Sequence, residues 1–387
     1  MTLILGLESS CDDSAAALVT SDRRILAQAV VGQNQAHQPY GGVVPEIAAR
    51  AHVEILPDLI AKVLGDAKLS IQDVDAIAAT AGPGLIGGVM VALLAGKGLA
   101  LASGKPLVAV NHLEGHALSP RLVDPDLGFP YLLLLVSGGH CQLLEVRGVG
   151  VYRRLATTID DAAGEAFDKA AKLLGLGYPG GPAIEELAKS GDAREVPLPR
   201  PLVGSAEPHF SFAGLKSAVL RAHQSGVWRS EDIAASFQQA VVDCLVDRTA
   251  LALDKAEAAT ALVAAGGVAA NGAVRSALAA LAERRGLPFI VPPAWLCSDK
   301  TQVWLARWPQ QARASINDTC RSAITTTSKN SWSESELWAC RSLIAGQSLA
   351  CFSTRRLPNS NKELKRRPRF WLKWEYCRSG VFKPAMI

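Results

Sequence analysis

Residues 131–146 read YLLLLVSGGHCQLLEV, and this stretch decides the fold class. Its first six residues, Tyr131–Val136, form a continuous apolar run, which is typical of a strand that is covered on both faces. The run ends at Ser137-Gly138-Gly139-His140, and apolar residues resume at Gln142–Val146. We therefore predict two strands joined by a glycine-rich loop, within a sheet that helices cover.

The same arrangement is predicted near the amino terminus, where Leu3–Leu7 and Ala15–Thr20 form a hairpin. The loop between them, Glu8–Ser14, is unusually acidic and rich in hydroxyl groups for a plain turn. Each half then ends in a strand, a glycine-rich loop and a helix, with strands at Val74–Ala79 and Ala261–Ala265. The sequence thus predicts an α/β architecture built twice, with a ligand in the cleft between the halves.

Composition excludes several classes of protein. The chain has 387 residues, 49% hydrophobic and 20% charged, which excludes disorder, coiled coil and collagen. The apolar segment Met1–Leu7 meets Glu8 without a basic leader, so it is predicted to be a strand and not a signal peptide. The longest apolar stretch, Leu85–Gly96, is interrupted by glycine and stops at Lys97, which is too short to span a bilayer. The eight cysteines form no CxxC pair, so we expect a soluble, cytoplasmic protein without a disulfide framework or a cysteine zinc site.

The charge distribution changes abruptly after position 300. Residues 301–387 hold 15 Lys+Arg, 5 Asp+Glu and six of the eight tryptophans, a net charge of +10, whereas residues 1–300 carry −6. A basic, nucleic-acid-binding extension is one interpretation of this segment. A reading-frame change just after Asp299 is the favoured one, because scattered tryptophan and cysteine are unusual in such tails. We predict a first lobe over residues 1–125, a second lobe over 126–299, and an atypical, poorly ordered basic tail over 301–387.

The segment Asn111–His116 carries two histidines four positions apart, at His112 and His116. On a helix these side chains share one face and can reach a single metal ion, although two exposed or capping histidines are the other interpretation. A zincin protease is disfavoured by geometry, because its glutamate directly follows the first histidine. Glu114 would instead lie about 200° around the helix from His112.

Glycine-rich loops and one acid suggest a nucleotide site. Ser137-Gly138-Gly139 and Gly266-Gly267 follow predicted strands, where backbone N–H groups can approach a phosphate closely, although a tight turn would also explain each loop. We expect the two loops in corresponding places in the two halves. Asp168 is either a surface acid that pairs with Lys172 or a carboxylate that accepts hydrogen bonds from ribose hydroxyls.

Together these motifs resemble one family over residues 1–299. It is the family of bacterial tRNA adenosine(37) N6-threonylcarbamoyltransferases, formerly described as O-sialoglycoprotein endopeptidases or glycoproteases. The matching blocks, in the order of the family, are Gly6–Asp13, Tyr40–Glu46, Thr80–Leu85, Asn111–His116, Leu135–His140, Asp160–Lys169, Tyr178–Pro182, Phe210–Lys216 and Gly266–Asn271.

The resemblance implies an actin- and Hsp70-like fold of two lobes. It implies transfer of a threonylcarbamoyl group from threonylcarbamoyl-AMP to N6 of adenosine 37 in tRNAs that read codons beginning with A. A divalent metal, usually Fe²⁺, would be held by His112, His116 and Asp299. The resemblance further implies an inactive paralogue and a small ATPase as protein partners, and no membrane. The residues that it implies for binding the adenylate substrate are Leu135, Val136, Ser137, Gly138, Gly139, Asp168, Gly181 and Asn271.

Two departures from the family pattern and two alternative functions accompany the resemblance. Cys141 stands where the family usually has threonine, and the resemblance stops after Asp299. A non-catalytic nucleotide-binding scaffold would keep the fold and lose the metal histidines, so the presence of His112 and His116 favours the enzyme. A kinase-like phosphotransferase of the same superfamily would need a general base, for which the sequence offers no distinct candidate.

Overall fold

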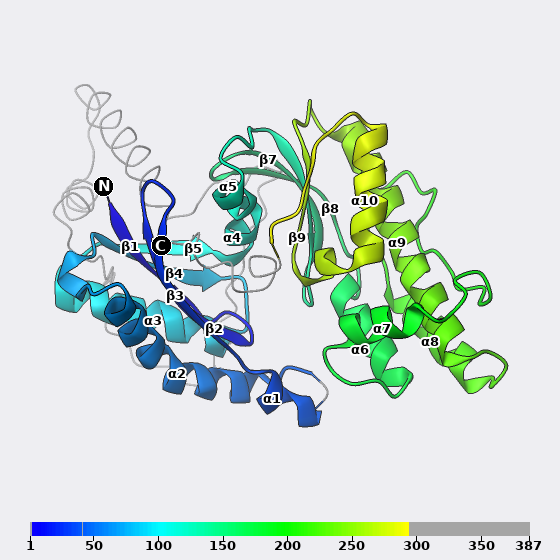
Figure 1. Cartoon of the computed structure of the whole chain (residues 1–387), viewed down its shortest axis with the longest axis horizontal. Helices are drawn as coiled ribbons and strands as arrows, with labels where there is room; N and C mark the ends of the chain where they lie inside the picture. The colour runs from blue at the N-terminus through cyan, green and yellow to red at the C-terminus, as the bar shows by residue number, and fades with distance from the viewer. Residues whose placement is uncertain (1, 41, 294–387) are drawn as a thin grey trace, which may run out of the picture. The chain divides into compact units, whose positions relative to one another are not determined.

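The computed structural model describes residues 2–40 and 42–293, and these residues form two five-stranded mixed sheets (Figure 1). The first sheet has the order β3-β2-β1-β4-β5 and the second the order β10-β9-β6-β7-β8. The strands of the first sheet are β1 (Leu3–Glu8), β2 (Asp13–Thr20), β3 (Ile25–Gly32), β4 (Ala76–Gly82) and β5 (Leu107–Asn111). The strands of the second are β6 (Tyr131–Val136), β7 (Cys141–Gly148), β8 (Val151–Thr157), β9 (Leu262–Ala265) and β10 (Phe289–Ile290).

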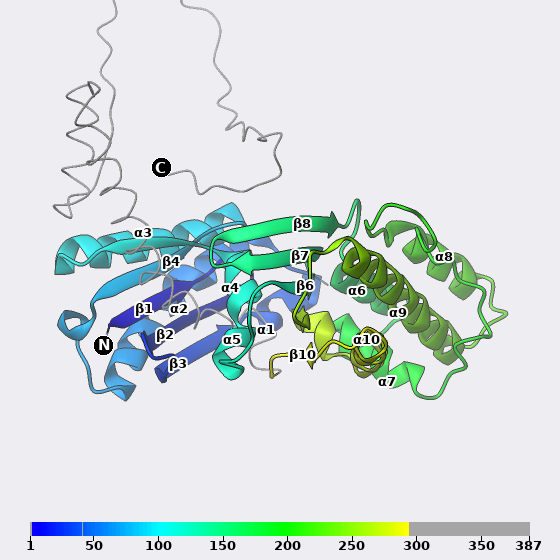
Figure 2. The same cartoon turned by 90° about the horizontal axis from the view of Figure 1, so that it is seen from above.

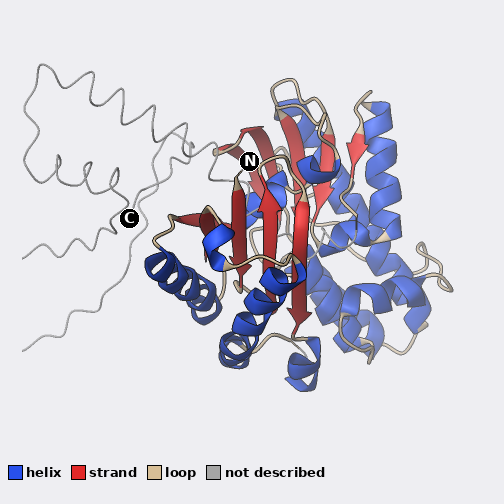
Figure 3. Cartoon of the chain, turned by 60° about the vertical axis from the view of Figure 1, so that its left-hand side comes forward, coloured by secondary structure: helices blue, strands red, loops and turns tan. Residues whose placement is uncertain are grey.

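In the first sheet, the predicted hairpin is confirmed by the antiparallel pairing of β1 with β2, in which Leu3 lies opposite Thr20. Strand β1 also pairs with β4 in parallel. Helices α2 (Pro45–Asp66) and α3 (Ile86–Ser103) lie along one face of this sheet (Figure 3). Burying leucines on that face removes apolar surface from water, which is the main stabilising contribution to the lobe. The buried residues there include Leu5, Leu7, Leu18, Leu56 and Ile77.

Helix α3 differs from the sequence-based expectation of a stretch too short to span a bilayer. It continues past Lys97 to Ser103, and its 18 residues have a mean hydropathy of 1.7. Among the described residues it is the helix that is long and apolar enough to cross a membrane by length and composition. Its inner side packs against β4 and α2, with Gly88, Ala92 and Gly96 buried, as in a helix that covers a sheet.

In the second sheet, all six residues of β6 are buried, as their continuous apolar run predicted. Leu132 and Leu134 face the helices that cover one side, whereas Leu133 and Leu135 face the opposite side. Those helices are α6 (Ala163–Leu173), α7 (Gly180–Ala188), α8 (Ala213–Gln224), α9 (Ser230–Lys255) and α10 (Gly272–Arg284). Helices α9 and α10 lie side by side (Figure 2).

The opposite side of β6 is covered by helix α4 (His112–Leu118), which follows directly after β5 of the first sheet. Ala117 and Leu118 pack among the buried residues on that side, and the Tyr131 hydroxyl donates a 2.6 Å hydrogen bond to the carbonyl of Ala117. Helix α5 (Pro120–Val123) leads from α4 towards the second sheet, and α1 (Asn34–His37) precedes α2. The helix that carries the histidine pair is therefore held by both lobes.

Several expected elements are confirmed, including the helix after Gly266-Gly267, which is α10. Strands β3 and β8 and helices α7 and α8 were not predicted. Asp299 and the tail over 301–387 lie outside the described residues, so the predictions made for them stay predictions.

Candidate active site

The two histidines lie in the first turns of α4, where the helix begins after β5. The Asn111 side chain caps the helix by accepting a 2.9 Å hydrogen bond from the Leu113 N–H. His112 is 6% exposed and His116 1%, and their Nε2 atoms lie 3.2 Å apart with the rings nearly perpendicular. The interpretation of two exposed histidines is therefore wrong, because both rings are buried and converge on one point.

The separation of the two Nε2 atoms fits the spacing of two ligands on one divalent metal. Two imidazole nitrogens bound at about 2.0–2.1 Å in tetrahedral geometry lie about 3.3 Å apart, close to the 3.2 Å observed. A hydrogen bond between the two rings would have a similar length. Within residues 2–40 and 42–293 no group of three acidic, histidine or cysteine side chains is placed to hold a metal. The predicted third ligand, Asp299, is outside those ranges.

Glu8 and two hydroxyl groups surround the other side of the His112 ring. Oε2 of Glu8 lies 3.3 Å from His112 Nδ1, and the Ser10 hydroxyl lies 3.0 Å from the same nitrogen. The Glu8 carboxylate also accepts hydrogen bonds from the Ser10 N–H and the Thr80 hydroxyl. Burial raises the pKa of Glu8, but His112 and these hydrogen bonds lower it more, and the net pKa lies below the ordinary value. Sequence reasoning missed Glu8, although the acidic, hydroxyl-rich loop was its signal.

Glu114 points away from the histidine pair, as the helical geometry predicted. Its Oε1 accepts a 2.5 Å hydrogen bond from the Tyr152 hydroxyl and a 3.1 Å one from the Gly150 N–H. Burial raises the pKa of Glu114 to about 7, while these two hydrogen bonds oppose the shift. Glu114 therefore ties α4 to the turn between β7 and β8, and it is not placed to act as a base beside the histidines.

Both glycine loops lie in the second lobe, so the expectation of one loop in each half is wrong. They follow β6 and β9, which are parallel neighbours paired through Leu135 and Ala265, so they meet at one edge of the sheet. Gly266 has a φ of +97°, and a Cβ there would lie 2.3 Å from the Val136 carbonyl oxygen, so only glycine fits. The first loop also lies near helix α4, because the ring of His140 lies 6.3 Å from that of His112.

The residues of the first loop combine a tight turn with open backbone. The Ser137 N–H donates to the His140 carbonyl, and the Ser137 hydroxyl accepts from the His140 N–H. Gly138 and Gly139 are exposed, and a Cβ on either would meet nothing within 4 Å. Leu135 and Val136 are fully buried in the two apolar layers beside the sheet, so their side chains cannot contact a ligand.

Asp168 lies on α6, and its Oδ1 accepts a 2.7 Å hydrogen bond from the Gly180 N–H. The structure gives it this partner and no ion pair with Lys172 among the described residues. Burial raises the pKa of Asp168, the hydrogen bond from Gly180 opposes the shift, and the charges of Asp12 and Glu165 add to the increase. Gly181 follows in the first turn of α7, with open space where its side chain would be.

Asn271 caps α10, since its side-chain oxygen accepts a 3.1 Å hydrogen bond from the Val274 N–H. Its amide nitrogen donates to Gln238 at 2.9 Å. The side chain is 7% exposed, so its position beside the second glycine loop is fixed. Cys141, the residue that departs from the family pattern, is fully buried in the core of the second lobe, and burial raises the pKa of its thiol.

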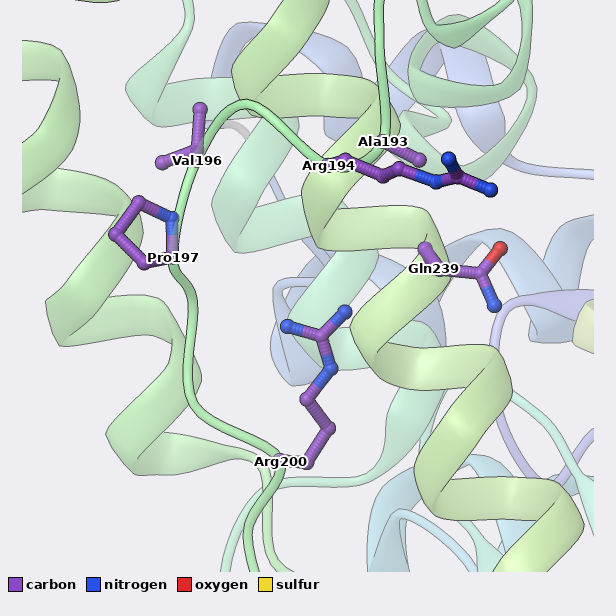
Figure 4. Close-up of a pocket in the computed structure, with 6 residues that line it drawn as sticks. All are labelled: Ala193, Arg194, Val196, Pro197, Arg200 and Gln239. Atoms are coloured by element: carbon purple, nitrogen blue, oxygen red, sulfur yellow. The ribbon is translucent and has the colours of Figure 1, made fainter.

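A hollow of about 540 Å³ lies elsewhere in the second lobe and contains none of the predicted site residues (Figure 4). Arg200 at its edge is held by Asp243 at 3.0 Å and by the Leu198 carbonyl at 2.7 Å. These contacts give Arg200 a structural task. The residues that line the hollow are Ala193, Arg194, Val196, Pro197, Arg200 and Gln239.

Comparison with known proteins agrees with the sequence motifs. Residues 24–303 match the family model described as tRNA N6-adenosine threonylcarbamoyltransferase. A protein of that name from Sphingopyxis alaskensis is 73% identical over 299 residues, which cover 77% of this chain and 87% of the relative. Another from Novosphingobium aromaticivorans is 67% identical over 305 residues, with the same coverage of each chain.

Solved structures support the fold alone. Full-length HypF, in its phosphate- and nucleotide-bound form, matches with a TM-score of 0.52 at 14% identity, covering 79% of this chain and 46% of that one. HypF from T. kodakarensis also has a TM-score of 0.52, at 17% identity over 78% of this chain and 46% of that one. The expected two-lobed α/β fold of the actin and Hsp70 type is confirmed.

Proposed function

Because the chain belongs to the tRNA N6-adenosine threonylcarbamoyltransferase family, we propose that it modifies adenosine 37 of tRNAs that read codons beginning with A. The donor is threonylcarbamoyl-AMP. The N6 amine attacks the carbamoyl carbonyl carbon, a new C–N bond forms, the C–O bond to the phosphate breaks, AMP leaves and the amine releases one proton to solvent. No motif of the sequence matches a nucleophile, which favours direct attack by the amine.

The observation that supports this proposal most directly is that the glycine loop after β6 lies near the histidine pair. His140 ends that loop, and its ring lies 6.3 Å from the ring of His112. The exposed backbone of Gly138 and Gly139 suits an adenylate phosphate, and Asp168 suits its ribose hydroxyls. A donor bound by this loop would place its carbamoyl end beside the buried imidazoles.

We propose that His112 and His116, with Asp299, hold one divalent metal, and that Fe²⁺ is its identity in the cell. The 3.2 Å between the two Nε2 atoms supports this assignment. When bound, such a metal supplies Lewis-acid polarisation of the donor. The imidazoles themselves need only hold their Nε2 atoms in fixed positions, which their burial on α4 favours.

We propose that an inactive paralogue and a small ATPase assist the enzyme, and that all three act on tRNA in the cytoplasm. The outer face of α3 supports a protein contact, since Ile86 is 78% exposed and Leu101 70%. Exposed apolar faces of this kind are typical of interaction sites. Replacing Leu94 on the same face by aspartate should abolish co-purification with the paralogue, whereas unchanged association would move the interface elsewhere.

The reaction can be tested with the purified full chain, its two partner proteins, tRNA and threonylcarbamoyl-AMP. We expect the modified nucleoside and AMP to appear in equal amounts, measured by liquid chromatography and mass spectrometry. A tRNA with guanosine at position 37 should stay unmodified. Formation of a nucleoside triphosphate-dependent phosphorylated product instead would indicate the phosphotransferase alternative.

A further inference from the structure

The residue that faces the inner side of His112 is Glu8, which lies 104 positions earlier in the sequence. It is the last residue of β1, it is 1% exposed, and both of its oxygens are engaged. Oε1 accepts from the Ser10 N–H, and Oε2 accepts from the Thr80 hydroxyl and lies 3.3 Å from His112 Nδ1. A buried carboxylate thus contacts the ring nitrogen that points away from His116.

We propose that Glu8 is a positioning residue that keeps the proton of His112 on Nδ1, so that the Nε2 lone pair faces the point shared with His116. This inference rests on the metal site of the proposed function. A histidine that binds metal usually donates its other N–H to a carboxylate or a carbonyl, which fixes both the tautomer and the orientation of the ring. Here the carboxylate comes from the first lobe, whereas α4 packs on the sheet of the second.

The neighbouring Ser10 hydroxyl does not fix the tautomer by itself. It lies 3.0 Å from His112 Nδ1, but a hydroxyl donates as readily as it accepts, so it suits either tautomer. The Ser10 N–H can only donate, and it already engages one oxygen of Glu8. An ionised carboxylate only accepts, so Glu8 favours one proton position on the ring.

Glu8→Gln tests this directly, because an amide has one oxygen where the carboxylate has two. With the amide oxygen at the Ser10 N–H, the NH₂ group faces His112 Nδ1 and requires that nitrogen to accept. The His112 proton then moves to Nε2, where it blocks the metal. With the amide reversed, its NH₂ group meets the Ser10 N–H, two donors in contact, which is unfavourable.

The tautomer of His112 can be read from the ¹⁵N and ¹³C shifts of the metal-free, histidine-labelled full chain at pH 8, with His112→Ala used to assign the signal. We expect the wild type to carry the proton on Nδ1 and Glu8→Gln to shift it towards Nε2. Titration with Co²⁺ alone should show a dissociation constant that is about 10- to 100-fold larger in Glu8→Gln. This is the usual loss of metal affinity when the hydrogen-bond partner of a metal-binding histidine is replaced. Ser10→Ala should keep the proton on Nδ1.

Glu145→Gln is the matched control, because Glu145 is a fully buried carboxylate on β7 that pairs with Arg147 and Arg153. It should leave both the tautomer and the Co²⁺ affinity unchanged. A wild-type His112 with its proton on Nε2 would overturn the inference without any variant, even if Glu8→Gln failed to fold. Loss of Co²⁺ in His112→Ala but not in Glu8→Gln would refute the role of Glu8 and keep the metal site. Equal Co²⁺ binding by wild type and His112→Ala would refute the metal site itself.

Discussion

Oδ1 of Asp168 accepts a 2.7 Å hydrogen bond from the Gly180 N–H, which joins α6 to the first turn of α7. The carboxylate that is proposed to bind ribose therefore also holds the turn before α7. Replacement by alanine would remove both tasks together, whereas Asp168→Asn keeps an oxygen for Gly180 and removes the charge. The amide variant thus separates ligand binding from local structure.

We predict that AMP raises the midpoint of thermal unfolding of the wild type and that Asp168→Asn loses most of this shift. The reason is that an ionised carboxylate accepts from two ribose hydroxyls more strongly than an amide does. Asp254→Asn is the control, since Asp254 pairs with Arg285 on the surface of the second lobe. If AMP raised the midpoint of thermal unfolding equally in the wild type and Asp168→Asn, Asp168 would not be part of the AMP site.

The raised pKa of Asp168 predicts a pH dependence of stability. Burial raises this pKa above the ordinary value of 3.8, so protonation of Asp168 favours the folded state. That contribution is present below pH 3.8 and is lost as the pH rises through the higher pKa of the folded protein. Urea unfolding across this range should show the wild type losing stability relative to Asp168→Asn as the pH increases. A difference independent of pH would contradict the raised pKa.

His112→Ala should abolish metal retention and tRNA modification together, because it removes one of two nitrogens that lie 3.2 Å apart. Metal content is measured by mass spectrometry of the purified protein, and modification by nucleoside analysis. His223→Ala is the matched control, since His223 is exposed in the last turn of α8. A variant His112→Ala with full metal and normal modification would show that the site assignment is wrong.

Much of the fold follows from local sequence patterns. The continuous apolar run of Tyr131–Val136 predicted a doubly covered strand because successive strand residues face opposite sides of a sheet, and all six residues are buried. Strand β8 was not predicted because only Ala156 of its seven residues is fully buried, so its sequence lacks an apolar pattern. Arg153 on this strand pairs with Glu145 on the neighbouring strand. Helix α7 was not predicted because it begins at Gly180-Gly181 after a proline, and this pattern predicts a turn.

The candidate site was predictable only where its residues are neighbours in the sequence. His112 and His116 share one helical face, and four positions of spacing suffice to bring them together. Glu8 contacts His112 only because β1 pairs in parallel with β4 and β4 pairs in parallel with β5. Helix α4 begins directly after β5, so His112 lies close to the end of β1. No pattern within the Glu8–Ser14 loop specifies that long-range contact, so the loop was seen as unusual without its partner being identified.

Gly266 and Gly267 provide a matched pair of substitutions in the second glycine loop. Gly266 has a backbone conformation, φ +97° and ψ 164°, that is nearly restricted to glycine. A Cβ there would also overlap the Val136 carbonyl oxygen, whereas a Cβ on Gly267 would meet nothing within 4 Å. Gly266→Ala should lower the free energy of unfolding by about 2–4 kcal/mol, and Gly267→Ala by less than about 1 kcal/mol. Similar losses in urea unfolding would contradict this conformation.

Tyr152→Phe should weaken the attachment of α4 to the hairpin of β7 and β8. The Tyr152 hydroxyl donates a 2.5 Å hydrogen bond to Glu114, and its removal leaves this partly buried carboxylate with the Gly150 N–H. The expected cost is about 1–3 kcal/mol in the free energy of unfolding, the usual loss when a buried acceptor is deprived of its donor. Tyr40→Phe is the control, because Tyr40 is 60% exposed and its replacement should change the urea midpoint little. Hydrogen exchange should localise the effect to α4, because Glu114 belongs to that helix. Uniform exchange across the lobe would mean that Tyr152 contributes to the core and not to the position of the histidine helix.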